Sequence, residues 1–66
     1  MLNTIHLQTF LAVVEAGNYS AAAERLHVSQ PSVSGSIAAL SEEVGVALTE
    51  RDGRGMKLSP AGEAFL

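Results

Sequence analysis

The chain has 66 residues, a length that allows one domain, near the lower limit at which a core is stable without disulfides or metals. It contains no cysteine, which excludes a disulfide framework and a thiolate zinc site. Its longest apolar run near the start, residues 10–14, is far too short for a membrane span, and nothing resembles a signal peptide. We therefore expect a soluble, cytoplasmic protein with no membrane partner.

The charge balance is acidic, with seven carboxylates against four Lys and Arg residues, a formal net charge of −3 and an isoelectric point near 5.1. Nucleic-acid-binding domains are expected to be basic, so the total charge argues against that partner. The cations are nevertheless unevenly distributed, because Arg51, Arg54 and Lys57 lie within seven residues. The sequence predicts a local positive edge on an acidic body.

The first predicted helix spans residues 4–16. Its apolar residues recur at i, i+3, i+4 and i+7, the spacing of an amphipathic helix: Leu7, Phe10, Leu11 and Val14. Asn3 or Thr4 is suited to cap its start, and Gly17 to end it. His6 falls outside the apolar stripe, and we expect it to be exposed and solvated rather than a phosphate or metal contact.

Residues 18–37 are predicted to form a helix-turn-helix. The second helix begins at Asn18 or Ser20 and runs to about Leu26. Its small residues allow another helix to approach closely: Ala22 and Ala23.

The turn of this unit is marked by His27-Val28-Ser29, which breaks the helical pattern. Ser29 is a natural N-cap for the next helix. Val28 before the cap and Val33 after it have the spacing of a hydrophobic staple, which sets the angle of entry. Pro31 is tolerated in the first turn, where amides lack intrahelical partners. Two helices joined steeply in this way indicate a helix-turn-helix.

The third predicted helix spans about residues 30–44 and ends at Gly45. One face carries an apolar stripe formed by Val33, Ile37, Leu40 and Val44. The opposite face has neither bulk nor charge and consists of Ser32, Ser34, Gly35, Ser36 and Ala39. Gly35 in mid-helix costs about 1 kcal/mol relative to a good helix former.

Residues 46–58 are predicted to form a two-stranded hairpin, because loose apolar alternation flanks the glycine-rich turn 52–55. Ser59-Pro60 is a strong helix start, with an N-cap followed by proline at the first helical position. Residues 59–66 therefore begin a fourth helix that the chain cuts short. We expect the chain to be a fragment or a shortened relative of longer proteins.

A resemblance to a known family rests on several segments of the sequence. Residues 22–34 read Ala-Ala-Glu-Arg-Leu-His-Val-Ser-Gln-Pro-Ser-Val-Ser, and matching residues follow at the expected spacing in 45–46, 50–51, 53–55 and 61–63. The chain thereby closely resembles the N-terminal DNA-binding domain of LysR-type transcriptional regulators, over essentially its whole length. The resemblance implies a mainly α, winged helix-turn-helix fold. Residues 1–58 would form the three-helix core and hairpin wing, and residues 59–66 the start of a linker helix.

The same resemblance implies the partners. The domain would bind one half-site of a two-fold symmetric operator in double-stranded DNA. Members of the family form homodimers or tetramers through the linker helix and later parts of the chain. A small-molecule effector binds a C-terminal domain that this chain lacks, and the DNA-binding domain itself needs no cofactor or metal.

The DNA-contacting residues that the resemblance implies are Asn18, Ser20, Gln30, Pro31, Ser32, Ser34, Gly35, Arg51 and Arg54. The start of the third helix would enter the major groove, where a glutamine can pair bidentately with adenine and serines can contact several groups. Free amides at a helix start also favour phosphate. The second helix would meet the DNA backbone, and the wing arginines would reach the adjacent minor groove or its phosphates.

The chain departs from the family pattern at informative positions. Family members usually carry arginine where Gly35 stands, and here the third helix contains no Lys or Arg. Each phosphate contact adds about 0.9 to the slope with which log K falls as log salt concentration rises. We therefore expect weak binding with a shallow salt dependence, equivalent to fewer than about four phosphate contacts per domain. Thr49 replaces a large apolar residue of the first wing strand, which should loosen the packing of that strand.

Several residues have simpler structural interpretations. We expect Arg25 to pair with Glu24 or Glu42, and Tyr19 either to touch a phosphate or to be partly buried. For Lys57, a solvated hairpin side chain is as good an interpretation as a DNA contact. The predicted core residues are Phe10, Leu26, Ile37 and Leu40.

Catalysis finds little support, because Glu42 and Glu43 are adjacent and do not share a helical face, and neither histidine has ligands at metal spacing. The alternative to DNA binding is a protein-interaction or dimerisation module of the same fold. The acidic balance and the bare third helix would suit such a module. Gln30→Ala separates the two hypotheses. A DNA-binding domain should lose its sequence preference in this variant, whereas a protein-interaction module should bind its partner unchanged.

Overall fold

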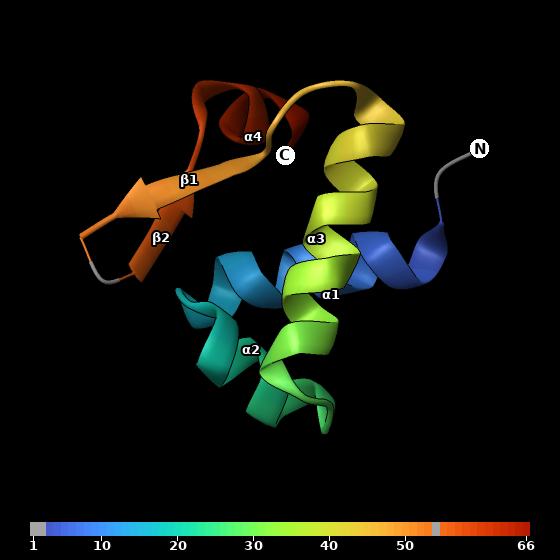
Figure 1. The fold of residues 1–66 in the computed structure, drawn as a ribbon, viewed down its shortest axis with the longest axis vertical. Coiled ribbons are helices and arrows are strands. Elements are labelled where there is room, and N and C mark those ends of the chain that lie inside the picture. Colours follow the sequence, from blue (N-terminus) through green and yellow to red (C-terminus); the bar gives the residue numbers. More distant parts are fainter. Residues whose placement is uncertain (1–2, 54) are drawn as a thin grey trace.

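A computed structural model describes residues 3–53 and 55–66 (Figure 1). The elements follow in the order α1 (Thr4–Ala16), α2 (Tyr19–Leu26), α3 (Gln30–Val44), β1 (Thr49–Asp52), β2 (Gly55–Leu58) and α4 (Pro60–Phe65). The predicted three-helix core, hairpin and fourth helix are confirmed. The hairpin was predicted to begin at residue 46, but its first strand begins at Thr49. The residues before it connect α3 to the strand, and one of them, Leu48, is fully buried in the core.

A side-chain oxygen caps the start of each helix, as the sequence predicts. At α1, the cap is Asn3 rather than Thr4, and its Oδ1 accepts from the amide of Ile5 at 2.8 Å. At α2, Asn18 rather than Ser20 takes this role, and its Oδ1 accepts from the amide of Ala21 at 2.7 Å. The caps of α3 and α4 are Ser29 and Ser59.

The first three helices end on residues in the left-handed region. Gly17 and Gly45 close α1 and α3 with φ of 87° and 86°. The C-cap of α2 is His27, with a φ of 58°. Among the described residues, it is the one residue other than glycine that has a positive φ. Its amide donates to the Glu24 carbonyl at 3.2 Å, which satisfies an end carbonyl of α2 within the turn.

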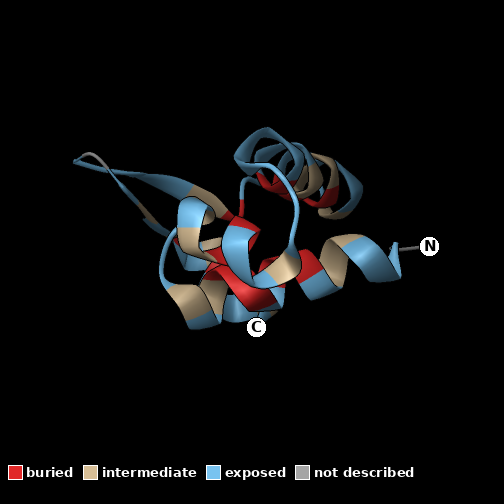
Figure 2. Ribbon diagram, turned by 90° about the horizontal axis from the view of Figure 1, so that it is seen from below, coloured by how far each residue is buried: buried red, intermediate tan, exposed pale blue. Residues whose placement is uncertain are grey.

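The core lies where α1, α2 and α3 cross, and the hairpin projects away from it (Figure 2). Its largest fully buried side chains are Phe10, Leu40, Leu48, Val13 and Val33. Ala22 is also fully buried, which confirms that the small face of α2 permits close helix approach. Leu26, predicted as core, is only half-buried, because it stands at the last position of α2 beside a surface groove.

The hairpin and α4 are joined to the core by the segment that precedes β1. The strands pair antiparallel, with Thr49 opposite Leu58 and Asp52 opposite Gly55. The buried Ser59 donates from its hydroxyl to the Ala47 carbonyl at 2.6 Å. The Phe65 ring of α4 meets the Phe10 ring edge to face, with centroids 5.8 Å apart. Helix α4 therefore covers the core beside the hairpin.

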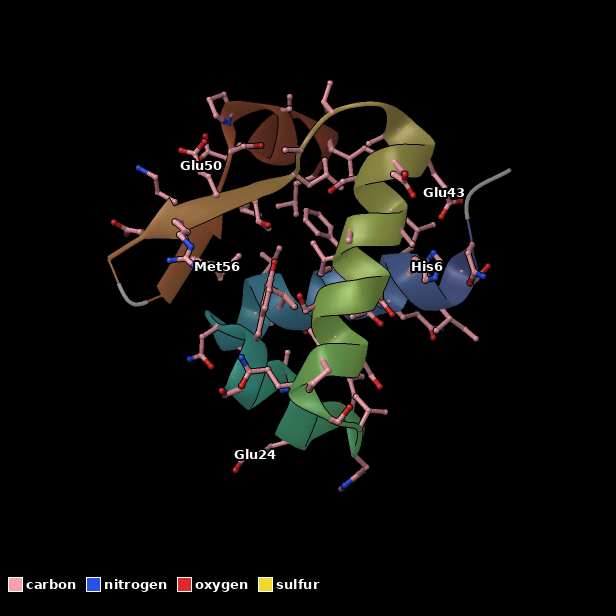
Figure 3. All side chains as sticks on the ribbon, viewed as in Figure 1. His6, Glu24, Glu43, Glu50 and Met56 are labelled. Carbon is pink, nitrogen blue, oxygen red and sulfur yellow. The ribbon has the colours of Figure 1, made fainter. Side chains whose placement is uncertain are left out.

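Two expectations about charged side chains are wrong. His6 is not freely solvated: its Nδ1 lies 2.8 Å from Oε1 of Glu43, and its side chain is 23% exposed. The packing of α1 across α3 brings these residues together from positions 37 apart (Figure 3). Arg25 pairs with Glu15 of α1, at 3.4 Å, instead of with Glu24 or Glu42, because α2 packs beside α1.

Glu43 links the start of α1 to the end of α3. Besides the His6 contact, its Oε2 accepts from the backbone amide of Asn3 at 3.1 Å. The hydrogen bond from His6 lowers the pKa of the Glu43 carboxyl below its ordinary value of 4.5, against an opposing effect of burial, and the Asn3 amide acts in the same direction as His6.

Glu43→Gln should lower the stability of the chain at neutral pH. The folded pKa lies below the unfolded one, so the carboxylate contributes its stability above about pH 4.5, and this contribution is lost as the pH falls through the folded pKa. The difference between the native chain and the variant should therefore shrink below pH 4.5. Urea unfolding of both proteins at several pH values measures this difference in the free energy of unfolding. Glu42→Gln makes the same charge change at an exposed neighbour, and an equal effect there would contradict the expectation.

Within residues 3–53 and 55–66, no helix has the length and apolar character needed to cross a membrane.

Candidate nucleic-acid interface

A groove with a volume of about 570 Å³ separates the helix-turn-helix from the hairpin. The first turns of α2 and α3 form one wall, and the two strands form the other. In Figure 3, Glu50 and Met56 lie on the hairpin, across α3 from the His6–Glu43 pair. The lining residues are Asn18, Tyr19, Ser20, Gln30, Thr49, Glu50, Arg51, Gly53, Gly55 and Met56.

Four of the predicted site residues meet at this groove: Asn18, Ser20, Gln30 and Arg51. Asn18 uses its Oδ1 as the cap of α2, so its side chain is held in place. The hydroxyl of Ser20 donates to Oε1 of Gln30 at 2.9 Å, although the two residues are ten positions apart. Both of these side chains are exposed. The helix starts thus present a fixed polar edge to the groove.

The other predicted residues of α3 lie outside this groove. Pro31, Ser34 and Gly35 are exposed along the helix, and a Cβ placed on Gly35 would meet nothing within 4 Å. Ser32 lies on the side of α3 that faces α1, where its hydroxyl accepts from that of Ser29 at 2.9 Å. Gln30 and Ser32 therefore line different surfaces, because a step of two residues turns a helix by more than half a circle.

Ser32 borders a second, more apolar groove of about 300 Å³. Its lining residues are Ile5, Gln8, Thr9, Leu26, Val28, Ser32, Val33 and Ser36. Val28 and Val33, the predicted staple, both line it, with Val28 about half exposed and Val33 buried.

The described charges on the hairpin are partly paired. Glu50 and Lys57 stand opposite each other in the ladder, with Oε1 and Nζ 3.8 Å apart. No carboxylate of the described residues lies within 4.0 Å of the Arg51 guanidinium, which leaves its donors available at the groove. Arg54, the other predicted wing contact, lies outside the described residues.

The floor of the groove contains a contact that the sequence did not suggest. The hydroxyl of Tyr19 lies 2.9 Å from Oγ1 of Thr49, so a hydrogen bond joins the start of α2 to the first strand. Partial burial of Tyr19 is thereby confirmed. The hydroxyl of Thr49 thus connects the strand to the start of α2, and the looser packing expected at Thr49 stays a prediction. Met56 was also missed, since apolar alternation in a short strand does not show which side chain faces a groove.

In the described parts of the chain, no group of three or more His, Cys, Asp or Glu residues is placed to hold a metal ion.

Comparison with known proteins identifies the family. The profile described as "Bacterial regulatory helix-turn-helix protein, lysR family" matches residues 5–63, nearly the whole chain. The chain belongs to the LysR family of bacterial regulatory helix-turn-helix proteins. Among its LysR-type relatives, the transcriptional regulator TcbR of Pseudomonas sp. (strain P51) is 55% identical over 60 residues, which cover 91% of this chain and 20% of TcbR.

Two solved LysR-type domains in complex with DNA have the same fold. The CbnR_DBD–DNA complex matches with a TM-score of 0.89 and 52% identity, over 97% of this chain and 74% of that one. The complex of BenM_DBD with catB site 1 DNA matches with a TM-score of 0.87 and 41% identity, over 96% of this chain and 71% of that one. The winged helix-turn-helix assignment is thus confirmed. The chain spans about a fifth of the length of full LysR-type regulators such as TcbR.

Proposed function

We propose that the chain is the DNA-binding domain of a LysR-type transcriptional regulator and binds one operator half-site in double-stranded DNA. The observation that carries this proposal is the match over 97% of the chain to a domain solved with DNA, at a TM-score of 0.89. In this arrangement α3 enters the major groove. The hairpin reaches the adjacent backbone or minor groove.

The exposed polar side chains of α3 and of the hairpin support this orientation. Gln30, Ser34 and Arg51 are exposed polar groups that can donate to base edges or phosphates. The backbone amide of Gln30 adds one donor for a phosphate at the N-terminal end of α3, where the helix dipole favours an anion, whereas Pro31 has no N–H and the Ser32 amide donates to Oγ of Ser29. Gln30 is the residue that we assign to base reading, because it stands at the start of α3 and lines the groove.

The low charge of α3 determines how tightly the domain would hold DNA. Neither Lys nor Arg occurs in α3, and Gly35 offers an open position without a side chain. Affinity from phosphate neutralisation is therefore small for a single domain. We propose that the whole regulator gains affinity by binding as a homodimer or tetramer, in the cytoplasm, under control of a small-molecule effector held by another domain.

The test is a fluorescence-anisotropy titration of the chain against random duplexes at two salt concentrations, with sequencing of the bound fraction. We expect a short shared sequence to be enriched, with a salt slope equivalent to fewer than about four phosphate contacts. Gln30→Ala should abolish the preference at one or more base pairs while low-salt binding persists, because a good base contact contributes about 1–3 kcal/mol of discrimination.

Gln8→Ala provides the matched control, since Gln8 is an exposed glutamine of α1 beside the second groove. It should leave the selected sequence unchanged. A folded sample that enriches no sequence at low salt would contradict the proposal and favour the protein-interaction module.

A further inference from the structure

The contact between Ser20 and Gln30 gives Gln30 a defined chemical orientation. A glutamine carboxamide presents an acceptor oxygen on one side and two N–H donors on the other, and a free one can turn over. Here Oε1 accepts the hydroxyl of Ser20 at 2.9 Å. The oxygen is therefore directed toward α2, and the Nε2 donors are directed away from it.

The turn between the helices makes this contact possible. The left-handed conformation of His27 and the cap at Ser29 change the direction of the chain between α2 and α3, and the first turns of both helices line the same groove. Asn18 fixes the position of the first turn of α2 by capping it. Both partners thus stand on capped helix starts, and no movement of the backbone is required to keep the hydrogen bond.

We propose that Ser20 is a positioning residue that determines which base Gln30 selects. By holding Oε1, it presents the Nε2 donors to an acceptor on a base edge in the major groove, such as a purine N7, guanine O6 or thymine O4. This inference rests on the proposed function. It differs from the role that the family resemblance implies for Ser20, which is a contact with the DNA backbone.

The two roles predict different effects of Ser20→Ala. A lost positioning contact weakens discrimination at the base pair read by Gln30, by about three- to tenfold for one side-chain hydrogen bond, and leaves binding to unrelated duplexes unchanged. A lost backbone contact lowers affinity for all duplexes by the same factor, because phosphates carry no sequence information.

The experiment is a double-mutant cycle with Ser20→Ala and Gln30→Ala, measured on the selected duplex, on its single-base variants and on an unrelated duplex. We expect Ser20→Ala to reduce discrimination in the native background and to have no effect on discrimination once Gln30 is alanine. Ser20→Thr keeps the hydroxyl and should restore the native base preference. A uniform loss of affinity in both backgrounds would overturn the inference while leaving the proposed function intact.

A measurement without DNA tests separately whether Ser20 holds the Gln30 side chain in position or serves only as a contact with the DNA backbone. Nitrogen-15 relaxation of the Gln30 side-chain amide should show greater mobility in Ser20→Ala than in the native chain or in Ser20→Thr. Equal mobility in all three would overturn the positioning role, whatever the DNA measurements give. A native chain that binds no DNA would overturn the proposed function and, with it, the assignment of base selection to Ser20.

Discussion

Phe10→Ala should remove a large share of the free energy of unfolding of the chain. Phe10 is 1% exposed, and its ring packs between the three-helix core and the Phe65 ring of α4. Truncating a buried phenylalanine to alanine costs about 3–5 kcal/mol, because the transfer free energy is lost and a cavity remains. A domain of this length has a total stability of about 3–10 kcal/mol, so the loss is of the same order as the whole.

The measurement is urea and thermal unfolding followed by far-ultraviolet circular dichroism. Leu11→Ala is the matched control, because Leu11 is the next residue of α1 and is 53% exposed. It should change the free energy of unfolding by no more than about 0.5 kcal/mol. Similar losses in both variants would show that α1 does not bury Phe10 as described.

Gly62→Ala should have the second large effect, through overpacking. Gly62 is a buried residue of α4, and a Cβ at this position would overlap with the carbonyl oxygen of Leu48. That oxygen also accepts from the amide of Ser59 at 3.0 Å, and Leu48 itself is fully buried, so the carbonyl cannot move freely. We expect α4 to be displaced, at a cost of about 3 kcal/mol, the upper part of the usual range for overpacking.

Gly35→Ala makes the identical chemical change in the middle of α3, where a Cβ meets nothing within 4 Å. It should raise the free energy of unfolding by about 0.5–1 kcal/mol, because alanine has the better helix propensity and reduces the entropy of the unfolded chain. Unfolding curves of the two variants, recorded side by side, test the prediction. A Gly62→Ala chain as stable as Gly35→Ala would show that α4 is not held against Leu48.

Much of the fold could be predicted because its signals are local. The caps Asn18, Ser29 and Ser59 bond to amides three residues later, and Gly17 and Gly45 end helices through their own backbone conformation. Such interactions depend on neighbours within one turn of helix, so the sequence alone displays them. Helical spacing also placed the buried face of α3 correctly, at Val33, Ile37 and Leu40. In α1 it was wrong for Leu11, which is 53% exposed, whereas Val13, outside the predicted stripe, is fully buried, because the packing of α2 and α3 decides which face of α1 is covered.

The members of the candidate DNA-binding site stay a prediction from the family resemblance, whereas the arrangement of those residues comes from the structure. The family resemblance named Ser20, Gln30 and Arg51, and the structure brings these three to one groove. It also separates Ser32 from them, on the opposite side of α3. The role of Tyr19 in joining α2 to the first strand was not visible, because its partner Thr49 is 30 positions away.

The sequence by itself therefore determined the helices, their ends, the hairpin turn and the helix-turn-helix unit. Only the tertiary structure decided which distant side chains meet: His6 with Glu43, Arg25 with Glu15, and Ser20 with Gln30. The physical reason is that a local conformation follows from a few neighbouring torsions and hydrogen bonds. A contact between distant residues depends on the sum of all the turns and packing angles between them.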